Sequence, residues 1–194
     1  MFIIFYGPEG SGKSTQAKLL AAKLTLPVLV SGDLVRKYAD EDKGIMGEVC
    51  QDALESGHYV ADSEMFVLWK HRLKQPDTQN GFVIDGFPRN LSQAEFLEDK
   101  LDKYQKQIDF VFYLRVSREE SIKRLSARGR KLSNGENHDS PERIVQRLEM
   151  YQVEEAGVLE FYKKKGVLCE VNGERSVEEI HREILETLKT KIIK

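Results

Sequence analysis

Gly7-Pro-Glu-Gly-Ser-Gly-Lys-Ser-Thr15 is the stretch of sequence that decides the fold. It follows an apolar run at 2–6, typical of a buried strand, and precedes an amphipathic stretch that predicts a helix over 13–23. A glycine-rich loop in this position lets backbone amides wrap around phosphate oxygens, while the helix N-terminus adds partial positive charge. We expect Lys13 to reach the β- and γ-phosphates of a nucleotide, and a hydroxyl that follows it to meet Mg²⁺. The residues predicted to bind phosphate are Gly10, Ser11, Gly12, Lys13, Ser14 and Thr15.

A second polar motif, Asp85-Gly-Phe-Pro-Arg89, closes the apolar run at 81–85. In an open parallel sheet, ligands bind outside the carboxyl ends of the strands, so we expect Asp85 to point at the same crevice as the phosphate loop. There it would hold Mg²⁺ through water, together with Ser14. Arg89 can bind a phosphate through two parallel hydrogen bonds.

Outward from these motifs, short apolar runs alternate with longer amphipathic stretches. The runs predict buried strands at 2–6, 27–30, 81–85, 109–116 and 167–171. The stretches predict helices at 13–23, within 34–74, at 91–103, at 117–128, from Pro141 to Gly166 and after Ser176. Five strands separated by helices imply an α/β fold, in which a parallel sheet is covered by helices on both faces.

The region between the second and third predicted strands is longer than one crossover needs. It predicts helical pieces within 34–74, broken at Gly44 and Gly57, and its length indicates a small lobe that projects from the core. We expect Ser31 to cap the first of these helices, and Asp62 or Ser63 to cap the last. The chain as a whole, 1–194, is predicted to be one domain.

Two arginine pairs flank the polar segment 129–140, which is rich in Gly, Asn and Ser and is predicted to be a mobile loop. Arg124 and Arg128 lie four residues apart on one predicted helix, and Arg143 and Arg147 repeat that spacing on the next. Residues four apart share one face of a helix. The pairs therefore indicate a clamp that closes on a charge-rich phosphoryl group.

The composition excludes several classes of protein. Of the 194 residues, 40% are hydrophobic and 32% are charged, as in a globular domain, and a net charge of −2 does not favour a nucleic-acid or membrane surface. The apolar runs are far shorter than the ~20 residues of a membrane helix, and Met1 leads straight into a strand, so we expect a cytoplasmic protein. Two cysteines and four histidines without ligand spacing predict no structural zinc.

Together these motifs resemble the adenylate kinase family of nucleoside monophosphate kinases, and the likeness covers essentially the whole chain. Besides the two motifs above, it rests on the segments Gln16-Ala17, Ser31-Gly-Asp-Leu-Val-Arg36, Gly57-His-Tyr-Val60 and Gln93-Ala94. The resemblance implies a P-loop kinase fold that transfers the γ-phosphoryl group of ATP, bound with Mg²⁺, reversibly to AMP to give two ADP. It also implies a monomer whose partners are ATP, AMP and ADP, with no nucleic acid and no membrane.

The resemblance also implies roles for particular segments and residues. The lobe at about 31–60 would bind the monophosphate, and the segment at about 129–139 would be a short lid over ATP. The implied AMP-binding residues are Ser31, Arg36, His58, Tyr59, Val60, Gly86, Arg89, Gln93 and Arg147, with Gln93 at the adenine edge. The implied ATP-binding residues outside the phosphate loop are Arg124, Arg128 and Arg175. The implied catalytic residues are Lys13, Arg89, Arg124, Arg128 and Arg147.

The chain departs from the family's pattern in the phosphate loop and in the lid. Glu9 and Ser14 stand where the family usually has proline and glycine. The positions of one lid arginine and one lid aspartate fall on Glu136 and His138. The lid candidates that remain are Arg130, Asp139 and Arg143.

Three functions are therefore compared on the sequence: an adenylate kinase, a kinase for UMP, CMP or dTMP, and a nucleotide-binding sensor without turnover. The phosphate loop also resembles that of thymidylate kinases, and Asn90 is common in kinases for pyrimidine monophosphates. Gln93 favours adenine, because an amide offers both a donor and an acceptor. Lys13, Asp85 and Arg89 are intact and argue against a sensor. We expect an adenylate kinase.

Overall fold

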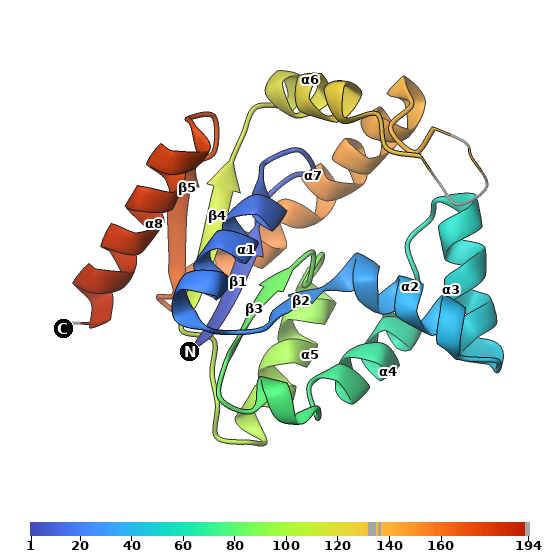
Figure 1. The fold of residues 1–194 in the computed structure, drawn as a ribbon. Coiled ribbons are helices and arrows are strands. Elements are labelled where there is room, and N and C mark those ends of the chain that lie inside the picture. The colour runs from blue at the N-terminus through green and yellow to red at the C-terminus, as the bar shows by residue number, and fades with distance from the viewer. Residues whose placement is uncertain (132–134, 136, 193–194) are drawn as a thin grey trace.

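Five parallel strands form one sheet at the centre of the structure, a computed structural model that describes residues 1–131, 135 and 137–192 (Figure 1). The strands are β1 (Phe2–Tyr6), β2 (Val28–Val30), β3 (Phe82–Asp85), β4 (Phe110–Arg115) and β5 (Leu168–Asn172). Their order in the sheet is β2-β3-β1-β4-β5, which places β1 in the middle between β3 and β4. The predicted α/β fold with a parallel sheet is confirmed.

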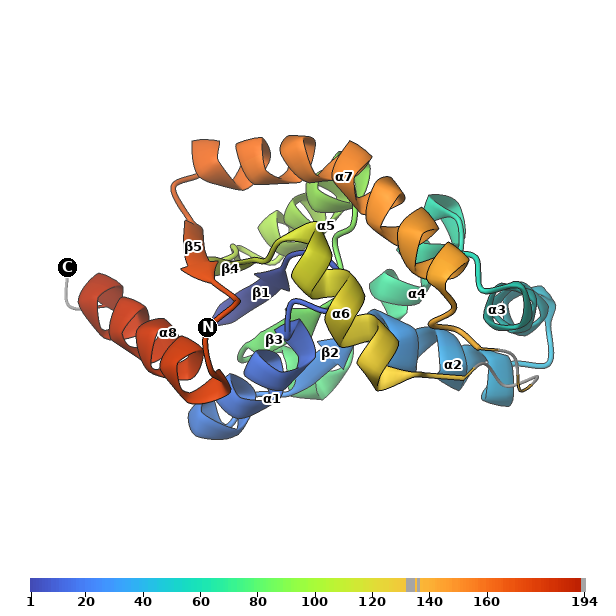
Figure 2. The ribbon, with the colours of Figure 1, turned by 90° about the horizontal axis from the view of Figure 1, so that it is seen from above.

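Helices cover both faces of this sheet, as the view from above shows (Figure 2). On one face lie α1 (Lys13–Leu24) and α8 (Val177–Ile192), and on the other lie α5 (Leu91–Asp102) and α7 (Pro141–Lys164). A further helix, α6 (Arg118–Arg128), packs against α7 and lies above the carboxyl end of β4. Within the described part of the chain, no helix is both long enough and apolar enough to cross a membrane.

The alternation of side chains along β1 divides the hydrophobic core into two layers. Ile3 is fully buried in the layer that contains Leu20 of α1, whereas Ile4 is fully buried in the layer that contains Leu97 of α5. Successive residues of a strand point to opposite faces of the sheet. Because both faces are covered, the strand is apolar along its whole length, as the sequence predicts.

A lobe of helices projects beyond the β2 edge of the sheet (Figure 1). Its elements are α2 (Ser31–Glu41) and α3 (Ile45–Ser56). The chain then returns to the core through α4 (Asp62–Arg72), which packs against α5, and through the short 3-10 helix η1 (Pro76–Thr78). The first two helices pack closely, since a Cβ atom on Gly47 would lie 1.9 Å from the carbonyl oxygen of Asp42. The helical pieces expected within 34–74 are confirmed.

Two of the expected helix caps are wrong. Ser31 is the first residue of α2 rather than its cap, and its hydroxyl donates to the carbonyl oxygen of Gly86 at 2.9 Å. Ala61 occupies the capping position of α4, so neither Asp62 nor Ser63 caps that helix. In both cases the polar side chain bonds a partner other than the helix's own backbone, which a local sequence pattern does not reveal.

Candidate active site

The phosphate loop runs from the end of β1 to the start of α1, and its glycines adopt backbone angles that other residues rarely reach. Gly7, Gly10 and Gly12 have φ angles of 139°, 84° and 90°. A Cβ atom on Gly7 would lie 2.6 Å from the carbonyl oxygen of Leu114. Around Gly12, the N-cap of α1, a Cβ atom would meet nothing within 4 Å. The helix N-terminus therefore faces open space, in the position where it attracts an anion.

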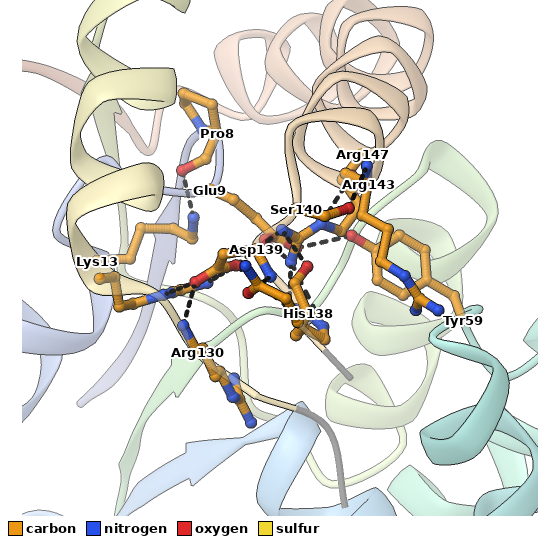
Figure 3. Close-up of polar contacts among 12 residues, drawn as sticks. Pro8, Glu9, Lys13, Tyr59, Arg130, His138, Asp139, Ser140, Arg143 and Arg147 are labelled. Atoms are coloured by element: carbon orange, nitrogen blue, oxygen red, sulfur yellow. Dashed lines mark hydrogen bonds and ion pairs between the residues drawn. The ribbon is translucent and has the colours of Figure 1, made fainter. Parts of the chain in front are cut away.

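Lys13 spans the mouth of this loop. Its ammonium group donates to the carbonyl oxygens of Gly7 and Pro8 at 2.6 and 2.7 Å (Figure 3). Burial lowers the pKa of Lys13, while the negative charges of Asp85 and Glu9 act in the opposite direction. A partly buried ammonium whose hydrogen-bond partners are all uncharged oxygens gains from an anionic ligand, so the predicted role of Lys13 at the phosphates agrees with its surroundings.

Ser14 and Asp85 meet where the loop passes the carboxyl end of β3. The hydroxyl of Ser14 donates to the Asp85 carboxylate at 2.5 Å, and Asp85 is almost fully buried. Both side chains supply oxygen atoms, and these suit Mg²⁺, which takes oxygen ligands. Ser14, rather than Thr15, thus pairs with Asp85. Among the described residues, no group of three or more His, Cys, Asp or Glu side chains is placed to hold a metal ion.

Arg89 and Tyr59 form the side of the site next to the lobe. The guanidinium carbon of Arg89 lies 3.6 Å from the centre of the Tyr59 ring, and its Nε donates to the carbonyl oxygen of Gly86 at 3.1 Å. A cation over an aromatic face is attracted by the ring's negative face. The same carbonyl oxygen accepts the Ser31 hydroxyl, so residues implied to hold AMP come from α2, from the segment before α4 and from the end of β3.

Gln93 has protein partners for both ends of its amide. Its oxygen accepts the backbone N–H of Arg89 at 2.8 Å, and its nitrogen donates to Asp62 at 2.6 Å. Asp62 also accepts a hydrogen bond from Asn90 at 2.9 Å. These contacts fix the orientation of the amide, and an adenine edge would have to replace one of them. The role of Asp62 as their shared partner is one that the sequence analysis missed.

Arg147 of α7 lies buried among carboxylates. Its Nη2 donates to Asp139 at 2.9 Å, and its Nη1 lies 2.7 Å from Glu9 of the phosphate loop (Figure 3). Asp139 also binds both Nε and Nη2 of Arg128 at 2.8 Å. Burial would raise the pKa of Asp139, but its bonds to Arg128, to the Arg130 N–H and to Arg147 outweigh burial and hold that pKa well below its usual range.

Glu9 is the functional candidate that the sequence analysis left without a role. Its carboxylate accepts the Tyr59 hydroxyl at 2.8 Å and pairs with Arg147 through its other oxygen. The phosphate loop is thus joined to the lobe and to α7 by one side chain. In the sequence, Glu9 stands out through its departure from the family's pattern. Its contacts could not be predicted, because the sequence does not indicate partners 50 or more residues away.

The remaining predicted residues on the ATP side lie around α6 and β5. Arg124 donates to the carbonyl oxygens of Gly173 at 2.9 Å and Gly10 at 3.3 Å, and so ties the phosphate loop to the segment after β5. Arg128 lies beside it on α6, with its charge balanced by Asp139. Arg175 is exposed and pairs with Glu183 of α8, apart from the loop.

Only some of the residues predicted in the lid and in the lobe lie close to the rest of the site. Burial and the nearby positive charges of Arg36 and Arg128 lower the pKa of Arg130, whose guanidinium points away from Lys13 (Figure 3). Arg143 donates to the carbonyl oxygen of Ser56 at 3.2 Å, at the end of α3. Val60 is buried and His58 is exposed in the segment before α4. Glu136, expected in the lid, lies outside the described residues.

Comparison with known proteins agrees with this geometry. The family model described as adenylate kinase matches residues 5–167. The chain is 36% identical to the adenylate kinase of Leptospira biflexa over 186 residues, which cover 96% of this chain and 98% of the relative. It is 35% identical to the adenylate kinase of Stenotrophomonas maltophilia over 190 residues, which cover 97% and 100%, and 37% identical to adenylate kinase 1 of a Nostoc species over 186 residues, which cover 96% and 97%. The chain belongs to the adenylate kinase family.

Proposed function

We propose that this protein transfers the γ-phosphoryl group of ATP, bound with Mg²⁺, reversibly to AMP and so forms two ADP. The observation that supports this most directly is the Glu9 carboxylate, which contacts both Arg147 and Tyr59 from within the phosphate loop. One side chain therefore connects the loop that would bind the donor's phosphates to the arginines that would bind the acceptor's phosphate. Such proximity is what a direct transfer between two nucleotides requires.

The chemistry needs no covalent intermediate and no general base, because positioning and neutralisation of charge carry most of the rate of phosphoryl transfer. Lys13 would hold the β- and γ-phosphates from the mouth of the loop, and Arg128 would offset charge from α6. Arg89 and Arg147 would hold the acceptor's phosphate in line. Ser14, together with Asp85 through water, would hold Mg²⁺, which would supply further positive charge near the transferring group.

On the acceptor side, Ser31 and Arg36 of α2 would join Arg89 at the phosphate of AMP, with Val60 near the base and Gln93 at its edge. The near-neutral net charge of −2 supports small nucleotides as partners, in preference to nucleic acid or an anionic membrane. We also propose that the protein is a monomer and that it acts in the cytoplasm.

The test is a coupled assay of ADP formation with ATP and each nucleoside monophosphate in turn. AMP is expected to exceed UMP, CMP and dTMP by at least roughly tenfold in kcat/KM, because uracil, cytosine or thymine would leave buried polar groups unpaired. A pyrimidine monophosphate as the best acceptor would overturn the choice of AMP while leaving phosphoryl transfer intact. No transfer to any acceptor would overturn the catalytic function itself.

A further inference from the structure

Glu9 places a negative charge inside a loop whose function is to bind negative phosphates. Its side chain is 28% exposed, and its two carboxylate oxygens contact Arg147 at 2.7 Å and the Tyr59 hydroxyl at 2.8 Å. The guanidinium carbon of Arg89 in turn lies over the Tyr59 ring, 3.6 Å from its centre. Glu9 therefore contacts one acceptor-side arginine, Arg147, directly (Figure 3), and it is linked to the other, Arg89, through the Tyr59 ring.

Arg147 has no N–H group to spare in this arrangement. A guanidinium carries five N–H donors. Nε donates to the carbonyl oxygen of Arg143 at 3.1 Å. Nη1 serves Glu9 at 2.7 Å and the ring Nδ1 of His138 at 2.8 Å, and Nη2 serves Asp139 at 2.9 Å and the His138 carbonyl oxygen at 3.2 Å. A phosphate can reach Arg147 only if one of these acceptors leaves.

Glu9 is the acceptor most readily exchanged for a phosphate. Asp139 is fully buried and also binds Arg128 through two hydrogen bonds, whereas Glu9 is partly exposed and belongs to the loop itself. Burial would raise the pKa of Glu9, but Arg147, Arg89 and the Tyr59 hydrogen bond outweigh it, and the pKa is lowered. Glu9 is thus ionised at neutral pH, and a phosphate beside it would be repelled.

We propose that the Glu9 carboxylate takes the place of the acceptor's phosphate. The carboxylate binds Arg147 when no nucleotide is bound and leaves Arg147 when the acceptor binds. Glu9 then sets the affinity for the acceptor. A binding site that is occupied by its own protein for about nine-tenths of the time binds its ligand roughly tenfold more weakly. This inference rests on the proposed function, because it takes Arg147 as a ligand of the acceptor's phosphate.

The test compares the affinities of AMP and adenosine by calorimetry in the wild type and in Glu9→Gln, which keeps the size of the side chain and removes its charge. We expect the Kd of AMP to fall by about fivefold or more, while the Kd of adenosine, which has no phosphate, stays within about twofold. Glu9→Ala, which removes the carboxylate entirely, should act in the same direction. Glu178→Gln, the same change at an exposed position of α8, is the matched control for net charge and should leave both affinities unchanged.

Two results would overturn the proposal. Weaker or unchanged binding of AMP in both Glu9 variants would show that Glu9 supports Arg147 instead of competing for it. An equal gain for AMP and adenosine would show an effect that does not involve the phosphate. Because the experiment measures binding, it is independent of turnover; if another monophosphate is the true acceptor, that nucleotide and its nucleoside replace AMP and adenosine.

Discussion

At the scale of single residues, the site is built from charged side chains whose hydrogen-bond and ion-pair partners the structure identifies. Lys13 illustrates this: its ammonium is held by two carbonyl oxygens and is already partly desolvated. Carbonyl oxygens satisfy its hydrogen bonds without neutralising its charge. The charge therefore remains available for the phosphoryl group, on which negative charge is redistributed in the transition state.

Lys13→Ala is accordingly expected to lower kcat for ADP formation on the order of 10²–10⁴-fold. The substitution removes a side chain at the edge of the loop, so the far-ultraviolet circular dichroism should be unchanged. Lys18→Ala, an exposed position of the same helix, is the control and should keep the wild-type rate. A folded Lys13→Ala variant with near-normal kcat would remove Lys13 from the mechanism.

His138 adds a charge that depends on pH. Its ring Nδ1 accepts a hydrogen bond from Arg147 at 2.8 Å, which only the neutral ring can do. Burial and the positive charge of Arg147 lower its pKa, with Arg130 acting in the same direction and Asp139 and Glu9 opposing it. Protonation of His138 would therefore place two cations against each other next to the proposed acceptor site.

This pKa shift predicts how stability depends on pH. Because the pKa of folded His138 lies below the free value of 6.5, the unfolded chain takes up the proton first as the pH falls. His138 therefore begins to destabilise the fold below about pH 6.5, and its full effect is reached below its folded pKa. Between about pH 7.5 and about pH 5, the melting temperature of wild type should fall more than that of His138→Asn, which keeps an acceptor for Arg147. Parallel profiles for the two proteins would contradict the assignment.

At the scale of elements, the sequence predicted what depends on local pattern. The strands and helices follow from runs of apolar residues and their spacing, and β1 shows why: Ile3 and Ile4 are both buried because the sheet is covered on two faces. The caps at Ser31 and Asp62 were wrong because each side chain bonds a residue from another element. The contacts of Glu9 and Gln93 could not be predicted for a similar reason. The partners of Glu9 lie far away in the sequence, and Asp62, the partner of Gln93, could not be distinguished from other polar residues.

The packing of α2 against α3 offers a test of the lobe. Gly47→Ala would place a methyl group 1.9 Å from the Asp42 carbonyl oxygen, so α3 would have to move, and we expect destabilisation of more than about 1 kcal/mol. Gly157→Ala, in α7, is the matched control. Its Cβ would lie 3.6 Å from the nearest side-chain atom, so the better helix propensity of alanine should stabilise the protein by about 0.5–1 kcal/mol. Urea unfolding of both variants measures whether each substitution lowers or raises the free energy of unfolding. Equal changes in the two variants would contradict this packing.

At the scale of the whole molecule, the site lies where separate parts of the fold meet. The phosphate loop belongs to the core, Tyr59 comes from the segment that leaves the lobe, Asp139 lies just before α7, and Arg147 lies within α7 (Figures 1 and 3). A site shared in this way can be completed by movement of the lobe toward the core, and closure that excludes water would favour transfer over hydrolysis of ATP.

This arrangement supports the central claim that the protein moves a phosphoryl group between two bound nucleotides in either direction. The most direct test is to incubate the protein with ADP and Mg²⁺ alone and to follow the nucleotides by phosphorus NMR, with Lys13→Ala as the inactive control. We expect ATP and AMP to form from ADP in equal amounts until the reversible reaction reaches equilibrium. If no ATP forms, or if AMP and free phosphate form without ATP, transfer between two bound nucleotides is contradicted.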